Sequence, residues 1–147
     1  MDKEVFKKTE RVLYDYLGIK AEISNLELEI EQLENEYGGL GAMTYDEKTG
    51  PTNNISDAIA NEIIFKDKEL YRLRKAKKSK EILLKKVDNA IAILDDTEKS
   101  LIKYKYLTRG NTWQTVGDIL SLDSNYCCNK LRVSIINKLK YIIFPKR

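Results

Sequence analysis

With 147 residues, the chain is long enough for one domain or for a small domain with an extended arm, and 42% hydrophobic with 33% charged residues is typical of a folded, heavily charged helical protein. The absence of histidine excludes His-based nucleophilic triads, general bases and metal ligands, and the adjacent Cys127 and Cys128 cannot form a zinc site alone. Residues 1–53 hold 12 acids and 6 bases, a net charge of −6, whereas residues 54–147 hold 11 acids and 20 bases, a net charge of +9, so only the second part is expected to approach a polyanion.

The N-terminal third is predicted to form two consecutive helical segments. Residues 3–17 carry a wide apolar face, and Gly18 is expected to end or kink this first helix. Apolar residues then recur at alternating intervals of four and three, which is typical of a coiled-coil seam: Ile19, Ile23, Leu26, Ile30, Leu33 and Tyr37. Glutamates occupy most other faces of this segment, and the helix is expected to stop at Gly38 and Gly39.

A Gly-rich loop is predicted over residues 38–53. Four of the seven glycines and one of the two prolines fall in this range. A loop of this length is uncommon unless it is functional or disordered. Met43 and Tyr45 could contact a partner there, or the segment could be the mobile end of a hairpin.

A second long helix is predicted from Asn54 or Ser56 to residue 94. Its seam residues are Ile59, Ile63, Leu70, Leu73, Leu84, Val87, Ile91 and Leu94. Its first half is long enough to fold back antiparallel, which would set basic side chains near the glutamates of the preceding helix: Lys66, Lys68, Arg72 and Arg74. Residues 72–86 carry eight bases against one acid. These bases could contact phosphate, form a solvated face or match the acidic helix, and the sequence leaves the three interpretations open.

A domain boundary is predicted between residues 94 and 95, which separates a helical arm (residues 1–94) from a C-terminal domain (residues 95–147). Asp95, Asp96, Thr97 and Glu98 mark the break. Thr97 is expected to cap a helix through Leu107, and the acids suit its positive N-terminal end. Gly110 and Asn111 close that helix.

The C-terminal domain is predicted to contain a helix-turn-helix. Residues 112–120 form its first helix, with Thr112 as N-cap, and Val116, Ile119 and Leu120 share one apolar face. Trp113 is read as a core or inter-helix anchor rather than a base-stacking residue. Leu122 lies in the turn, and Asp123 or Ser124 caps the second helix. The apolar stripe of that helix comprises Cys127, Leu131, Ile135, Leu139 and Ile142. This helix is longer than DNA reading requires, so its apolar surface must pack on the long helix or on a second chain.

The second helix carries side chains suited to DNA recognition on the face opposite its apolar stripe. Asparagine can pair bidentately with adenine and arginine with guanine, while lysine holds phosphate. From Glu98 to Arg147 the chain has ten Lys and Arg against three acids, a net charge of +7. The candidate DNA-binding residues are Thr112, Gln114, Ser124, Asn125, Tyr126, Asn129, Lys130 and Arg132. The alternative is a helical hairpin with a solvated basic face.

Residues 112–120 resemble the first helix of the helix-turn-helix in region four of bacterial sigma factors, and residues 101–111 are similar to the helix and turn that precede it there. The same module recurs in phage late transcription regulators of the ArpU and RinA type, whose charged helical N-terminal part this chain also resembles. The resemblance implies double-stranded DNA, and RNA polymerase, as partners. The chain departs from sigma factors over residues 124–128, where those proteins carry several arginines, so base specificity does not carry over.

The sequence therefore predicts an all-α protein: an N-terminal antiparallel helical hairpin followed by a sigma-region-four-like helix-turn-helix. The expected function is that of a sequence-specific transcription regulator of phage or prophage origin, acting in the cytoplasm of a bacterial host. The alternatives are a DNA-packaging protein like a small terminase subunit and a coiled-coil interaction adaptor. The chain shows no phosphate loop, nucleophile elbow or metal cluster, so neither an enzyme nor a cofactor is expected.

The longest apolar runs fall short of the roughly 20 residues that span a bilayer, and residues 1–4 are unlike a signal peptide, so no membrane association is expected. A homodimer would place two recognition helices about one DNA turn apart, but the sequence does not decide the oligomeric state.

Overall fold

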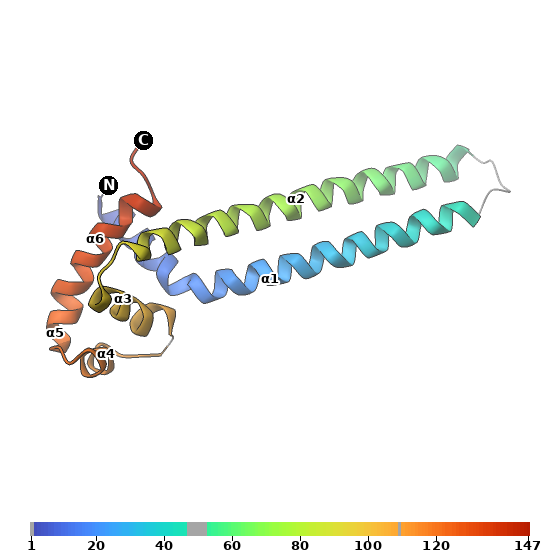
Figure 1. The fold of residues 1–147 in the computed structure, drawn as a ribbon. Helices are drawn as coiled ribbons and strands as arrows, with labels where there is room; N and C mark the ends of the chain where they lie inside the picture. The colour runs from blue at the N-terminus through green and yellow to red at the C-terminus, as the bar shows by residue number, and fades with distance from the viewer. Residues whose placement is uncertain (1, 47–52, 109) are drawn as a thin grey trace. The chain divides into compact units, whose positions relative to one another are not determined.

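The computed structural model describes residues 2–46, 53–108 and 110–147, with side chains described from residue 2 to 36, from 57 to 108 and from 110 to 147. Within these ranges the regular elements are all helical, so the expected all-α class is confirmed (Figure 1). The elements are α1 (Asp2–Asp46), α2 (Asn53–Ala92), α3 (Asp96–Ile102), the π-helical η1 (Lys103–Leu107), α4 (Trp113–Leu120), α5 (Ser124–Tyr126), the π-helical η2 (Cys127–Leu131) and α6 (Arg132–Ile143).

The chain divides into two compact units, each described by itself below. Unit 1 comprises residues 1–20 and 82–147, and unit 2 comprises residues 21–81. This division differs from the boundary expected after residue 94. Long-range contacts are the reason, because Tyr16 on α1 donates a hydrogen bond to Asp88 on α2 and Glu10 accepts one from Tyr106 on η1. The first turns of α1 therefore belong to the same compact body as the C-terminal elements.

Helix α1 continues through glycines that were expected to interrupt it. Helix α1 passes Gly18 without ending, and residues 38–46, predicted as loop, are helical. An interior glycine costs a helix only about 1 kcal/mol relative to alanine, whereas proline costs about 3 kcal/mol, so glycine weakens a helix without blocking it. Helix α2 begins at Asn53. The rest of the predicted loop, residues 47–52, and the side chains of Met43 and Tyr45 lie outside the described residues.

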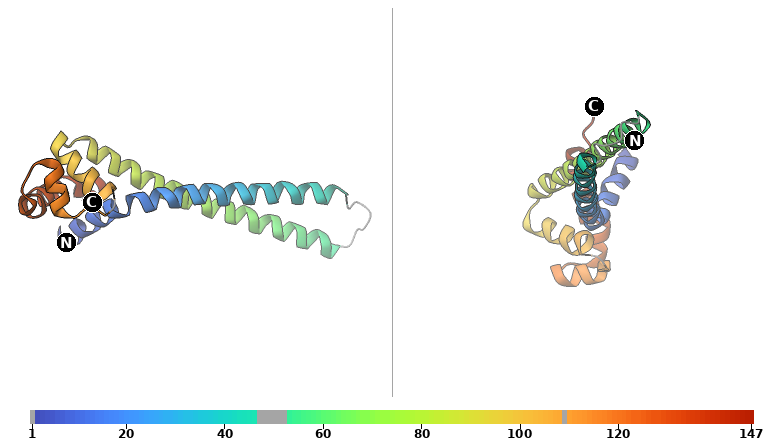
Figure 2. Two further views of the ribbon diagram at one scale, coloured as in Figure 1. Left: turned by 90° about the horizontal axis from the view of Figure 1, so that it is seen from below. Right: turned by 90° about the vertical axis from the view of Figure 1, so that its right-hand side faces the viewer.

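Unit 2 consists of antiparallel segments of α1 and α2, which lie side by side in Figures 1 and 2. Leu70 and Leu73 are 8% and 5% exposed at the centre of the seam. Ion pairs cross it from α1 to α2: Glu22–Lys80 at 2.8 Å, Glu27–Lys77 at 3.3 Å, Glu34–Arg74 at 2.7 Å and Glu36–Lys66 at 3.9 Å. Three bases of the stretch from residue 72 to 86 thus form ion pairs with the acidic helix, which was one of its three interpretations: Arg74, Lys77 and Lys80.

Arg72 also lies near the glutamates of α1 as expected, since it lines a surface pocket with Glu29 and Glu36 and its charge interacts with that of Glu29. Arg72 donates from its Nε to the Glu69 carboxylate on its own helix at 3.1 Å. Lys68 is exposed. Exposed ion pairs of this kind contribute about 0.2–1 kcal/mol each, so the buried leucines contribute more to the pairing than the charges do.

The apolar face of α6 is covered within unit 1. Ile135, Ile136 and Leu139 are completely buried, and Ile143 is 1% exposed. The apolar surface of this helix, which was expected to pack either on the long helix or on a second chain, is therefore buried within unit 1. The stripe ends on Ile143 rather than on Ile142, which is 38% exposed.

Helix α3 is capped by Asp95 and not by Thr97 as predicted. The Glu98 N–H donates to Asp95 Oδ1 at 2.8 Å, and the Asp95 N–H donates to Glu98 Oε1 at 3.1 Å, which completes a capping box. Glu98 is only 5% exposed, and Lys138 on α6 donates to its other carboxylate oxygen at 2.6 Å. This one glutamate therefore fixes the start of α3 and joins it to α6.

Candidate nucleic-acid interface

Helix α4 begins at a polar cap and ends in a tight turn. The Thr115 N–H donates to Thr112 Oγ1 at 3.2 Å, which confirms the predicted N-cap. Ser121 adopts the left-handed conformation, with φ 58° and ψ 40°, and the Leu122 N–H donates to the Gly117 carbonyl at 2.9 Å. The buried face of α4 is centred on Val116 and Gly117. Ile119, which was predicted to share that face, is 46% exposed, because the turn folds back against Gly117.

The second helix begins at Asp123, one of the two predicted caps, whose Oδ2 accepts from the Tyr126 N–H at 3.2 Å. Elements α5, η2 and α6 then follow without interruption from residue 124 to 143. Within η2 the Arg132 N–H bonds to the Cys127 carbonyl, five residues earlier. The buried residues of the second helix are separated by multiples of four positions: Cys127, Ile135, Leu139 and Ile143. In a regular helix of about 3.6 residues per turn, such a spacing moves each successive side chain further around the axis. The wider π turn of η2 offsets part of this rotation.

Six of the candidate residues lie exposed at the surface, and they come from the start of α4 and from the first turns of the second helix. They are Thr112, Gln114, Asn125, Tyr126, Asn129 and Lys130. Ser124 is half-buried. Cys127, on the opposite side of the same turns, is completely buried. The exposed side chains of these turns, which form the exposed row, therefore have a fixed orientation relative to the core: Asn125, Tyr126, Asn129 and Lys130.

Arg132 is placed differently from the other candidates, because it is held in an internal ion pair. Its Nη1 donates to Glu10 Oε2 at 2.8 Å, and its Nε donates to the Cys128 carbonyl at 2.9 Å. Burial opposes the charged guanidinium, but the hydrogen bond and charge of Glu10 hold the pKa of Arg132 above its ordinary value. Tyr106 donates to the same Glu10 oxygen at 2.7 Å. Arg132 therefore joins the second helix to α1, and a guanine contact by this side chain is not supported.

The segment before α4 is held by a small polar network. Asn111 Nδ2 donates to the Tyr104 carbonyl at 2.6 Å, and Lys105 Nζ donates to the Asn111 carbonyl at 3.0 Å. The Lys105 ammonium also lies 4.8 Å from the centre of the Trp113 ring, a cation–π distance. Trp113 is half-buried, so the structure places it where an inter-helix anchor would be.

The two cysteines are both free thiols. Cys127 is buried, as predicted, and burial raises the pKa of its thiol, which leaves it protonated and unreactive. Cys128 is half-buried. In the part of the chain that the structure describes, no group of three or more Asp, Glu or Cys side chains could hold a metal ion.

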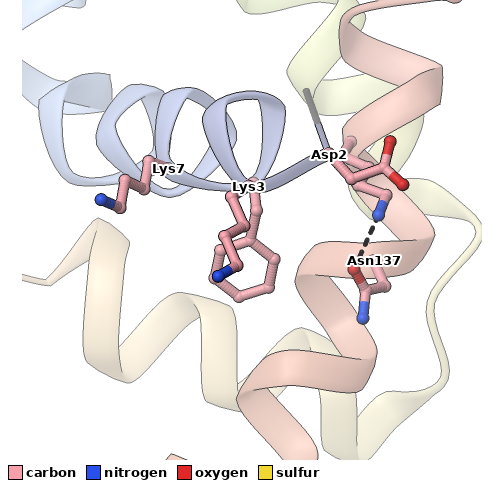
Figure 3. A pocket seen from close by; sticks show the side chains of 6 residues that line it. Asp2, Lys3, Lys7 and Asn137 are labelled. Carbon is pink, nitrogen blue, oxygen red and sulfur yellow. Dashed lines mark hydrogen bonds between the residues drawn. The ribbon is translucent and has the colours of Figure 1, made fainter.

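A cluster of lysines from the two ends of the chain was missed by the sequence analysis. Lys3 and Lys7 on α1 and Lys140 on α6 line one pocket together with Asn137 (Figure 3). Each lysine taken alone looks like an ordinary surface residue, and no feature of the sequence indicated that the two ends of the chain meet at one pocket.

Comparison of the chain with models of protein families, with characterised proteins and with solved structures gave no match. None of the described helices is both long enough and apolar enough to cross a membrane. Function is therefore inferred from the geometry and charge of the described residues.

Proposed function

We propose that the protein is a sequence-specific DNA-binding transcription regulator, in which α4, the turn and the second helix act as a helix-turn-helix. One observation carries this proposal. The first turns of the second helix present a row of polar side chains, Asn125, Tyr126, Asn129 and Lys130, while Cys127 anchors the opposite side in the core. A helix held in this way fits the major groove, which admits an α-helix and distinguishes every base pair.

The residue types assign a division of roles along this surface. Asn125 and Asn129 are suited to bidentate pairing with adenine, and Lys130 to a phosphate. Thr112 and Gln114 lie exposed at the start of α4, where polar side chains and free backbone N–H groups contact phosphate in DNA-binding proteins. The ion pair of Arg132 with Glu10 joins the second helix to α1 and so holds its position.

The resemblance of residues 101–120 to sigma factor region four adds a biological context to this proposal. It favours a regulator of phage or prophage origin that contacts RNA polymerase as well as DNA. Co-purification with host polymerase on a promoter fragment, compared with the fragment alone, tests the second partner. Binding of DNA without any retention of polymerase would restrict the function to DNA recognition.

The decisive experiment is the selection of bound duplexes from a random pool at about 150 mM salt, where nonspecific phosphate binding is already weakened. Enrichment of a single motif is expected, and a palindromic motif would indicate a dimer. A pool that stays random would refute sequence-specific recognition.

Variants at the exposed row sharpen this test. Asn129→Ala should reduce discrimination at one base position by about 1–3 kcal/mol, whereas Lys130→Ala should weaken binding to all sequences alike. Lys68→Ala is the matched control, because Lys68 is an exposed lysine of unit 2 and its removal changes the charge equally. Equal losses for Lys68→Ala and Lys130→Ala would show that only general charge attracts the DNA.

A protein-interaction role for unit 2 is the second candidate, and exposed apolar side chains on this unit favour it. Phe65 and Tyr71 on α2 are each 67% exposed, and Leu28 on α1 is 62% exposed. Failure of the whole protein to shift duplex DNA even at low salt, together with a partner lost on Phe65→Ser, would favour this adaptor role over DNA binding.

A further inference from the structure

The second helix carries its exposed polar face well beyond the residues proposed to read bases. Asn137 follows Lys130 by seven residues, which is nearly two full turns of a regular α-helix, and both side chains are exposed. At a rise of about 1.5 Å per residue, Asn137 lies roughly 10 Å further along the axis. That distance is comparable to the major-groove width of about 12 Å.

At this point the helix is joined by the first turns of α1. Asn137 and Lys140 on α6 line a pocket of about 230 Å³ with Asp2, Lys3, Phe6 and Lys7 on α1. Figure 3 shows Lys3 and Lys7 projecting from α1 and Asn137 projecting from α6. Lys140 Nζ donates to Asn137 Oδ1 at 2.9 Å, so these two side chains are already held together.

The wall of the pocket is mostly apolar, but the charged residues around it favour an anion beside it. Three lysines line it against a single acid, Asp2. The Asp2 carboxylate accepts a hydrogen bond from Tyr141 on α6, and this bond, with nearby Lys140 and Lys146, holds the pKa of Asp2 below its ordinary value. Asp2 is therefore ionised and occupied by its own partner, while Lys3 and Lys7 are exposed on neighbouring turns of one helix face.

We propose that the side chains grouped around this pocket bind a backbone phosphate of duplex DNA: Lys3, Lys7, Asn137 and Lys140. The phosphate would belong to the strand that borders the groove entered by residues 125–130, so the inference rests on the proposed function of that helix. The lysines supply point charges, and the Asn137 amide adds a hydrogen bond that fixes the position of the phosphate. This contact makes the N-terminal end of α1 part of the DNA-binding surface.

The salt dependence of binding tests the phosphate contact. Each phosphate neutralised on B-DNA contributes about −0.9 to the slope of log K against log salt. The double variant Lys3→Gln/Lys7→Gln should therefore lower the slope by about 0.9 in magnitude and weaken binding about five-fold at 150 mM salt. The loss should be the same for a preferred and an unrelated duplex, because phosphates carry no sequence information.

Two control variants separate this contact from general effects. Lys3→Arg/Lys7→Arg keeps both charges and should retain the wild-type slope. Lys68→Gln/Lys75→Gln removes two exposed lysines of unit 2 and should leave the slope unchanged. Thermal melting of each variant checks folding, and Lys3 and Lys7 are both exposed, so little change in melting temperature is expected.

The outcomes distinguish this inference from the proposed function. An unchanged slope for Lys3→Gln/Lys7→Gln, with a reduced slope for Lys130→Gln, overturns the phosphate pocket and leaves the recognition helix intact. Equal slope losses for the Lys3/Lys7 and Lys68/Lys75 variants also overturn it. If the wild-type protein enriches no motif but the Lys3/Lys7 variant still lowers the slope on an unrelated duplex, sequence reading fails and the phosphate site stands. No binding to any duplex at low salt refutes both.

Discussion

Replacement of Gly117 by alanine tests how closely the turn packs on α4. A Cβ at this position would lie 2.7 Å from the Leu122 carbonyl oxygen and 3.2 Å from the Ser124 nitrogen. Both atoms belong to the backbone, so neither can rotate away. The Leu122 N–H donates to the Gly117 carbonyl at 2.9 Å, and movement of the turn would stretch that bond. The substitution must therefore shift the chain that orients the second helix.

Two opposing effects set the size of the change at Gly117. Overpacking of this kind typically costs about 1–3 kcal/mol. Alanine in a helix interior regains up to about 1 kcal/mol over glycine. The clash is expected to prevail, with a net loss of about 1–2 kcal/mol and a melting temperature roughly 2–8 °C lower for a chain of this size. Thermal unfolding followed by circular dichroism measures both values.

Asp118→Ala provides the control, because Asp118 is exposed on the same helix. Its unfolding free energy should stay within about 0.5 kcal/mol of wild type. A Gly117→Ala protein that melts at or above the wild-type temperature would show that the turn does not press on α4. Such a result would remove the structural reason for the fixed direction of the second helix.

Three further predictions concern contacts elsewhere in unit 1. Glu10→Gln removes the charge that faces Arg132 and should lower the unfolding free energy in urea by about 1.5–3 kcal/mol; an unchanged midpoint would contradict the internal role of that arginine. Burial, assisted by the hydrogen bond to Asp88, raises the pKa of Tyr16 to about 12 from 10.0, so its contribution to stability should be complete below pH 10 and lost as the pH rises to 12. Tyr16→Phe should flatten that decline, and a decline of unchanged steepness would refute the assignment. Ser121→Gly relieves a left-handed residue with φ 58° and should raise the unfolding free energy by about 0.5–1 kcal/mol, unless the turn is unstrained, in which case stability falls.

The sequence by itself determined the helical class and the local features of the C-terminal elements. Apolar periodicity identified Cys127, Ile135 and Leu139 of the buried stripe, because side chains three or four positions apart share a face in any helix, but it missed Ile136 and Ile143. The cap Thr112 was predicted, and Asp123 was one of two predicted candidates, since a cap bonds only to the next turn. The same reasoning wrongly chose Thr97 where Asp95 caps α3. The predicted helix end at Gly38 and Gly39 was also wrong, because the cost of one glycine is small beside that of tertiary packing.

Only the tertiary structure decided which side chains are available to a ligand. Arg132 looked like a base-reading residue until Glu10, 122 positions away, was found to accept its hydrogen bond. Lys3 and Lys7 looked unremarkable until Lys140 joined them at one pocket. Residue type and local spacing determine which chemistry a side chain offers, but its partners depend on which distant segments fold together. The sequence therefore determined most of the elements and the proposed recognition residues, and the fold decided that α1 holds Arg132 through Glu10 and shares a pocket with α6.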